Sequence, residues 1–263
     1  MLQSLYSGIS GLGVHQRQLD VIGNDIANVN TTAYKQSQIT FKESMVDSMV
    51  GLGTNIANIS RDFSGGTLTE TNVDSNLALQ GDGFFIVMDT DSSNAATGAQ
   101  YYTRAGDFSL DVKDADTIYL VNSDGKALIG TDGNPINLEP AGDATLVSYS
   151  IGTDGTVTVT DSDGTSTEAG TIRVVTFEND EGLKAEGSNL YTWTSAACTT
   201  EPAAAEENGT NIGLIRQGYL ESSNTDLAKE FTEMITAQRG FQANSKTITT
   251  ADEILQSLLT LKQ

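Results

Sequence analysis

Apolar side chains near the N-terminus recur at alternating spacings of four and three. This heptad pattern predicts a helix over roughly residues 2–26 with one apolar stripe. Four glycines fall inside it (Gly8, Gly11, Gly13 and Gly23), and each costs a helix about 1 kcal/mol relative to Ala. We therefore expect a helix that is marginal alone and needs a partner. The apolar members of the stripe are Leu5, Ile9, Leu12, Leu19 and Ile26.

A second stripe occupies residues 227–263, where no Pro interrupts the pattern. Asn224 or Asp226 can cap its first turn. At 1.5 Å per residue, some 35 residues make a rod of about 50 Å, a length typical of coiled coils. Its apolar members are Leu227, Phe231, Met234, Phe241, Ile248, Leu255 and Leu259.

Two heptad helices at opposite ends of one chain are expected to pair with each other. The alternative is that each is an ordinary amphipathic helix packed on its own domain. In the paired arrangement the remaining apolar flanks require neighbours from other subunits. These flanks are Tyr6, Ile22, Ile235, Ile254 and Leu258.

The middle of the chain has the short apolar runs and Gly-containing turns of a β-rich region. The predicted strand segments are 77–88, 101–112, 117–130 and 148–177, with loops at 89–100 and 195–211. We expect the Asp-Gly pairs at 124–125, 154–155 and 163–164 to form type I′ hairpin turns.

The predicted fold class is α+β, with terminal helices in a coiled coil and a central, mainly antiparallel β module. The expected domains are a helical one from residues 1–35 and 219–263, an extended connector over 36–71, and an outer β domain over 72–218. We expect the connector to adjust when β modules of neighbouring subunits slide, and shortening residues 45–55 would test this.

Charge separates the middle from the ends. The 263 residues include 14 Lys and Arg against 35 Asp and Glu, for a net charge of −21. Residues 72–210 hold 23 acidic and 5 basic residues, so they account for −18 of it. Such a chain repels nucleic acid and anionic lipid. It has no run of 18 apolar residues and no basic segment ahead of its first apolar stretch, so we expect no membrane insertion and no cleaved signal peptide.

The residue inventory offers no catalytic chemistry. One Cys (Cys198) and one His exclude a disulfide and a Cys- or His-rich metal site, and His15 lies in a helical stripe, where we expect it to be solvated or interfacial. Asp161 begins an EF-hand-like string, but its twelfth position is Ile172 instead of Glu, so we expect a hairpin turn. We predict no enzyme and no catalytic, cofactor-binding or metal site. An enzyme or adhesin built on the acidic β module remains the alternative from another class.

The two ends and two inner strings resemble the bacterial flagellar rod and hook protein family. The strings are SLYSGISGLGVHQRQLDVIGNDIANVNTTAYK at 4–35, LQGDGFFIV, YYTRAGDFSLD, and GYLESSNTDLAKEFTEMITAQRGFQANSKTITTADEILQSLLTLK at 218–262. One departure is Ala33, where the family usually has Gly. Because Gly there suggests a left-handed or tight backbone, we expect the turn near residue 33 to differ in this chain.

Within the family the sequence is most similar to the short form of the hook protein, and the distal rod protein is the alternative. The resemblance implies a subunit that polymerises with itself into the hook, a tubular universal joint on the cell exterior. It implies terminal helices that line a channel, with their apolar stripes as the assembly interface. It also implies the distal rod protein, the hook cap and the hook–filament junction proteins as partners, and export by the flagellar type III apparatus without cleavage.

Overall fold

A computed structural model describes residues 2–44, 53–90, 96–114, 117–139, 146–202 and 213–260. The chain divides into two compact units. Unit 1 comprises residues 1–30, 35–62 and 225–263, and unit 2 comprises 31–34 and 63–224. The two units are described separately below.

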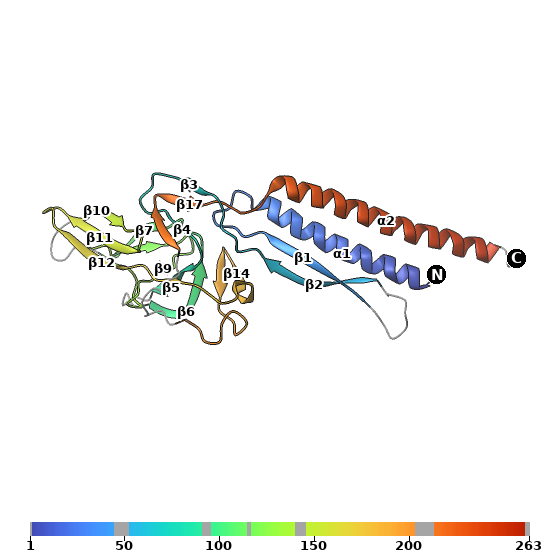
Figure 1. Cartoon of the computed structure of the whole chain (residues 1–263), viewed down its shortest axis with the longest axis horizontal. Coiled ribbons are helices and arrows are strands. Elements are labelled where there is room, and N and C mark those ends of the chain that lie inside the picture. Colours follow the sequence, from blue (N-terminus) through green and yellow to red (C-terminus); the bar gives the residue numbers. More distant parts are fainter. Residues whose placement is uncertain are drawn as a thin grey trace. The chain divides into compact units, whose positions relative to one another are not determined.

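Unit 1 is built on two long helices, α1 (Leu2–Ala27) and α2 (Leu227–Thr260), which lie side by side and run in opposite directions (Figure 1). The first turn of α2 is capped as expected, because Asp226 Oδ1 accepts the Ala228 N–H at 2.9 Å. The heptad pattern thus predicts both helices and their boundaries to within a few residues.

A two-stranded antiparallel hairpin completes unit 1. Strands β1 (Ser37–Glu43) and β2 (Thr54–Arg61) pair with each other and pack along α1 (Figure 1). The predicted connector over 36–71 is therefore a folded hairpin over its first part, while residues 63–71 belong to unit 2. The segment proposed for shortening, 45–55, lies largely outside the described residues.

Unit 2 is a set of mainly antiparallel β-sheets, as the turn-rich middle of the sequence predicts. Its largest sheet has the order β14-β15-β6-β5-β9-β8-β7, with β13 pairing to β5, and a second sheet has the order β10-β11-β12. Two strand pairs, β16 with β4 and β17 with β3, join the last strands of the unit to the first. The strands are β3 (Leu68–Glu70), β4 (Leu77–Gln80), β5 (Phe84–Thr90), β6 (Ala96–Thr103), β7 (Ser109–Asp114), β8 (Thr117–Val121), β9 (Ala127–Leu128), β10 (Leu146–Ile151), β11 (Thr156–Asp161), β12 (Ser166–Thr171), β13 (Val174–Val175), β14 (Lys184–Gly187), β15 (Leu190–Thr192), β16 (Leu214–Gln217) and β17 (Tyr219–Glu221).

The core of unit 2 lies on the two faces of β5, whose side chains alternate. Phe85 and Val87 join one apolar cluster, while Phe84 and Ile86 join another. The second cluster is aromatic, because Phe84 packs edge-to-face on Phe63 with ring centroids 5.5 Å apart. The predicted dense apolar strand is therefore buried on both faces.

The three Asp-Gly hairpins form, but their turn type differs from the prediction. Each has an N–H to C=O bond between the first and fourth turn residues, as from Gly164 to Asp161 at 3.0 Å. Only the glycines have positive φ (+76° at Gly125, +90° at Gly155), and the aspartates do not. This is the pattern of a type I turn followed by a left-handed Gly bulge, instead of type I′. A left-handed conformation is costly for Asp and costs Gly nothing, so Gly alone adopts it.

The predicted loops are shorter than expected where the structure describes them. Strands β5 and β6 take residues 89–90 and 96–100 from the predicted loop at 89–100, and its centre lies outside the described residues. Residues 195–202 contain no strand, and most of the remaining predicted loop also lies outside the described residues. The fold class is mixed α+β with a β-rich central part, as predicted, whereas the coiled coil remains a proposal.

Candidate assembly interface

The seam between α1 and α2 is built from small residues. A Cβ added at Gly8 would lie 3.1 Å from Ile248, and one added at Gly11 would lie 2.4 Å from the Asn244 amide. On α2, a Cβ at Gly240 would lie 2.5 Å from His15 Nε2. These glycines therefore allow the two backbones to approach closely. His15 is interfacial, one of the two placements expected for it.

Ile248, which lies against Gly8, is part of this seam, but the predicted stripe residues are not its most deeply buried part. The most deeply buried apolar side chains of the helix pair are Val14, Ile22, Ala237 and Ala251. Seven predicted interface residues are half-buried (Leu5, Leu12, Leu19, Ile26, Met234, Ile248 and Leu255), and five are exposed (Ile9, Leu227, Phe231, Phe241 and Leu259). An assembly role for the twelve remains a proposal.

A second pattern in the sequence, made of small and medium residues, marks the contact between α1 and α2. Small and medium residues recur on α2 at spacings of three and four, as the apolar stripe does. They are Ala237, Gly240, Asn244, Ile248 and Ala251. The sequence pattern indicates only that the four α1 glycines weaken the helix, but two of them, Gly8 and Gly11, lie where α2 leaves little room for a side chain, and Gly240 has the same place on α2.

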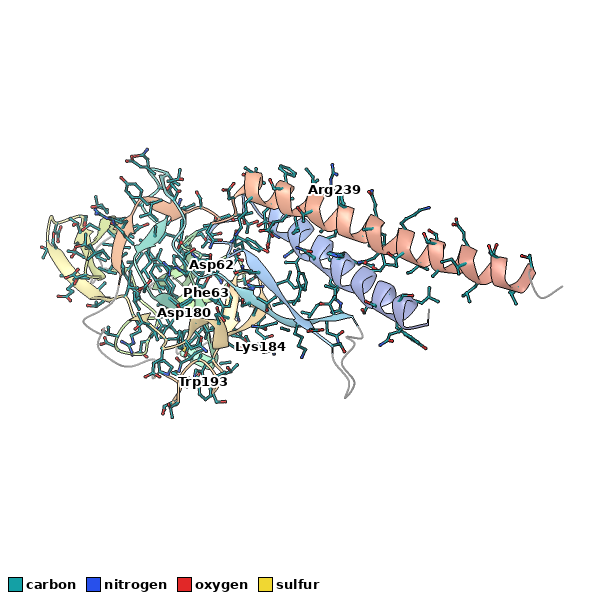
Figure 2. The ribbon with its side chains drawn as sticks, turned by 45° about the vertical axis from the view of Figure 1, so that its right-hand side comes forward. Asp62, Phe63, Asp180, Lys184, Trp193 and Arg239 are labelled. Carbon is teal, nitrogen blue, oxygen red and sulfur yellow. The ribbon has the colours of Figure 1, made fainter. Side chains whose placement is uncertain are left out.

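One face of α2 presents an exposed row at four-residue spacing. Leu227, Phe231 and Ile235 are 38%, 50% and 53% exposed, and Arg239 continues the row. Figure 2 shows Arg239 on the side of α2 that is turned away from α1. At about 100° per residue, this row lies well away from the seam residues. Apolar side chains exposed in a row of this kind are typical of an interaction surface.

A groove of about 510 Å³ lies between α1 and the β1–β2 hairpin. Val14 and Ile56 give it an apolar floor, while Arg17 and Lys42 place two cations at it. Neither cation forms an ion pair within the part of the chain that the structure describes. The groove is therefore apolar and basic in a protein whose net charge is strongly negative.

Two carboxyl groups are buried between the C-terminal end of α1 and the N-terminal end of α2. Asp25 is fully buried and accepts the Ser37 N–H at 3.1 Å. Glu230 is 4% exposed, and burial, together with the nearby Asp25 charge, raises the pKa of its carboxyl. The buried Glu230 carboxyl is therefore harder to ionise than an exposed one.

One buried ion pair in unit 2 holds together the segments through which the chain enters and leaves the unit. Arg104 Nε donates to Glu221 Oε2 at 3.1 Å, and the two side chains are 2% and 1% exposed. Glu221 Oε1 also accepts the Gly66 N–H at 2.7 Å, and the Glu221 carbonyl accepts the Ala33 N–H at 2.7 Å. The segments 31–34, 63–67 and 221–224 are thereby held together within unit 2.

Ala33 occupies a position where the flagellar rod and hook family, which this sequence resembles, usually has Gly. Its φ is +52°, so it keeps the left-handed backbone that Gly would adopt. The prediction that this turn would differ is wrong as far as the backbone hand is concerned. Its side chain is almost fully buried, and this burial offsets part of the conformational cost.

The two units differ strongly in charge. Unit 1 has 10 acidic and 8 basic residues, a net charge of −2. Unit 2 has 25 acidic and 6 basic residues, a net charge of −19. Copies of unit 1 can therefore approach one another closely, whereas copies of unit 2 repel.

The described residues offer no alternative site with catalytic or metal-binding geometry. Across the described ranges, no three His, Cys, Asp or Glu side chains gather closely enough to hold a metal ion. No helix among them is both long and apolar enough to span a bilayer. Asp161 and Gly164, considered for calcium, form a hairpin turn.

Three family profiles match the chain in the regions that carry the resemblance. Residues 5–35 match "Flagella basal body rod protein", residues 78–159 match "Flagellar hook protein FlgE/F/G D1 domain", and residues 216–261 match "Flagellar basal body rod FlgEFG protein C-terminal". The first and last lie mainly on α1 and α2, and the middle one lies in unit 2.

Curated relatives match over the whole length. The chain is 44% identical to the flagellar basal-body rod protein FlgG of Bacillus subtilis, covering all of both proteins. It is 34% identical to a FlgG of Buchnera aphidicola (98% of this chain, 99% of the relative) and 31% identical to the B. subtilis hook-basal body complex protein FlhP (97% of each). The chain therefore belongs to the bacterial flagellar rod and hook protein family. It is a structural component of the flagellum and not an enzyme.

Proposed function

We propose that this chain is a distal rod subunit of the flagellar basal body, which polymerises with itself into a stiff shaft that transmits torque. The observation that carries the proposal is the 44% identity over the full length to a protein named as a basal-body rod protein. Further full-length relatives between 31% and 34% identity have the same name. The hook, predicted first from the sequence, is thus the less favoured member of the family.

Unit 1 has the properties that a polymer-forming surface requires. It is nearly neutral, and it exposes apolar side chains along both helices, including Tyr6 (65%), Ile9 (57%) and Phe231 (50%). We propose that neighbouring copies cover these residues, and that the paired helices continue into a coiled-coil layer around a channel. The twelve predicted stripe residues belong to this proposed interface.

The remaining partners follow from the position of a rod. We propose that the chain reaches the growing end through the flagellar type III export apparatus, without cleavage. It then contacts other rod subunits, and the hook assembles on it. Unit 2, with its net charge of −19, faces outward in this arrangement. An outward position keeps acidic modules apart and limits their repulsion.

Electron microscopy of basal bodies from a strain lacking this gene tests the proposal. We expect a rod that ends before its distal segment and carries no hook. The full-length chain, supplied from a plasmid, should restore both. A complete rod without a hook would instead identify a hook subunit, and normal flagella would contradict both assignments.

A further inference from the structure

The C-terminal end of α2 extends past the end of α1. Gly8 lies against Ile248, Gly11 against Asn244 and Gly240 against His15. In this antiparallel pair, the numbers of two residues that face each other therefore add up to about 255. Leu2 therefore lies opposite about residue 253. From there α2 continues to Thr260 for about 10 Å at 1.5 Å per residue. Ile254, at the start of this stretch, still lines a hollow with Ser4 of α1.

This overhanging end is amphipathic and acidic. Leu259 is 70% exposed, and Ile254 is 46% exposed. Asp252 and Glu253 lie one to two turns before Leu259, and both are exposed. Asp252 accepts a hydrogen bond from Gln256 at 2.9 Å, and neither acid has an ion pair among the described residues. The end of α2 therefore presents apolar side chains beside two negative charges.

The groove between α1 and the β1–β2 hairpin has the complementary properties. Arg17 and Lys42 line it with positive charge, Val14 and Ile56 line it with apolar side chains, and its volume is about 510 Å³. Elsewhere on the hairpin, Phe41 and Ile59 are 43% and 46% exposed. The groove itself is an unfilled space within unit 1.

We propose that the α2 end of one copy, residues 252–260, occupies the α1–hairpin groove of a neighbouring copy. Its acids would pair with Arg17 and Lys42, and Leu259 would pack on the apolar floor. A chain cannot fill its own groove in this way. The α1 residues of the groove, 10–17, lie opposite about 238–245 of α2, roughly 20 Å along the helix from residue 256.

The proposed contact joins two different surfaces. Every copy therefore offers one α2 end to a neighbour and one groove to another. Heterologous interfaces of this kind build rings where the rotation between copies closes and open helical filaments where it does not, and a rod requires the open case. The inference rests on the proposed rod function, and it adds which surfaces meet between copies and which charges select the register.

Cysteine cross-linking in assembled basal bodies tests the contact. In a Cys198→Ser background, Asn55→Cys places a thiol at the groove and Gln256→Cys places one on the α2 end. We expect oxidation to give a ladder of dimers and higher oligomers that reducing agent removes. The matched control combines Asn55→Cys with Gln242→Cys, another exposed α2 glutamine, and should give no ladder. Assembled rods that fail to cross-link through residues 55 and 256, or that do so only through 55 and 242, would overturn the inference.

Charge reversal tests the proposed ion pairs. We expect Arg17→Glu with Lys42→Glu, and separately Asp252→Lys with Glu253→Lys, each to reduce the number of completed rods by about tenfold or more, because like charges meet at the contact. Combining all four substitutions should restore assembly to within a few-fold of the parent. Double variants that assemble normally, or a quadruple variant no better than the doubles, would contradict the pairing. In both experiments a truncated rod in the deletion strain is established first, so failure of the rod assignment is distinguished from failure of the contact.

Discussion

The two units of this chain bury their apolar residues to very different extents. Among the described residues, unit 2 buries 30 apolar side chains and exposes five large ones. Unit 1 buries only four and exposes ten. Unit 2 therefore has a core of its own, whereas unit 1 leaves most of its large apolar side chains exposed, as the proposed assembly surface requires. In that proposal, residues for folding and residues for assembly lie in different parts of one sequence.

The largest expected difference is between two phenylalanines, one in each unit. Phe85 is fully buried and packs edge-to-face on Phe108, so Phe85→Ala should lower the free energy of unfolding of unit 2 by about 3–5 kcal/mol. Phe231 is half exposed, so Phe231→Ala should change monomer stability by less than about 0.5 kcal/mol while impairing rod assembly. Denaturant unfolding of the monomer and counts of completed rods measure the two effects. If Phe231→Ala destabilised the monomer as much as Phe85→Ala, the comparison of the units would fail.

Two glycines of unit 1 should respond to alanine with opposite signs. A Cβ at Gly240 meets the His15 ring, and the resulting overpacking costs about 1–3 kcal/mol, more than the helix propensity gained. Gly23 has no atom within 4 Å of its added Cβ, so Gly23→Ala should stabilise α1 by up to about 1 kcal/mol. Helical circular dichroism during heating measures both. A stabilising Gly240→Ala would mean that the helices do not pack at this seam.

A smaller gain is expected from Ala33→Gly in unit 2. Gly adopts the left-handed conformation found at this position without strain, so the free energy of unfolding should rise by up to about 1 kcal/mol. The buried methyl group opposes the gain. Thermal unfolding of the variant measures the balance, and a net loss of stability would show that burial of the methyl group outweighs backbone strain.

The smallest expected effect is the pH dependence of unit 1 at Glu230. Its folded pKa lies above the unfolded value of 4.5, so the folded state holds more protons between the two pKa values. The contribution of Glu230 to stability therefore falls as pH rises through this window. Glu230→Gln should stabilise unit 1 relative to the parent above the window and not below it. Helix melting at several pH values measures the difference, with Glu43→Gln, an exposed glutamate of β1, as the control, and a difference independent of pH would contradict the sign.

The sequence predicts the elements better than their contacts. Heptad spacing identifies α1 and α2, and the Asp-Gly pairs identify the hairpins. The β1–β2 hairpin was interpreted as a connector, because half of its apolar residues stay exposed and its pattern has no single period. The seam was missed because its close contacts depend on glycines, which are invisible to a search for apolar side chains.

No local pattern predicts the buried Arg104–Glu221 pair. Its members lie 117 residues apart, and each resembles an ordinary charged residue near a strand. The local pattern also does not distinguish a hook subunit from a rod subunit. The C-terminal family model covers FlgE, FlgF and FlgG together, and full-length relatives, not any single residue, favour the rod.

The strand pairs that close unit 2 bear on the order in which the chain can fold. The strands β16 and β17 are among the last to be synthesised, yet they pair with β4 and β3 near the start of the unit, and Glu221 fastens both ends. A chain that emerges from a narrow passage one residue at a time cannot complete this module until about residue 221 is outside. Closure then requires contacts between distant parts of the sequence, and such contacts form slowly. If the chain is exported from its N-terminus, as proposed above, this topology would delay the folding of unit 2 until most of the chain has left the export channel.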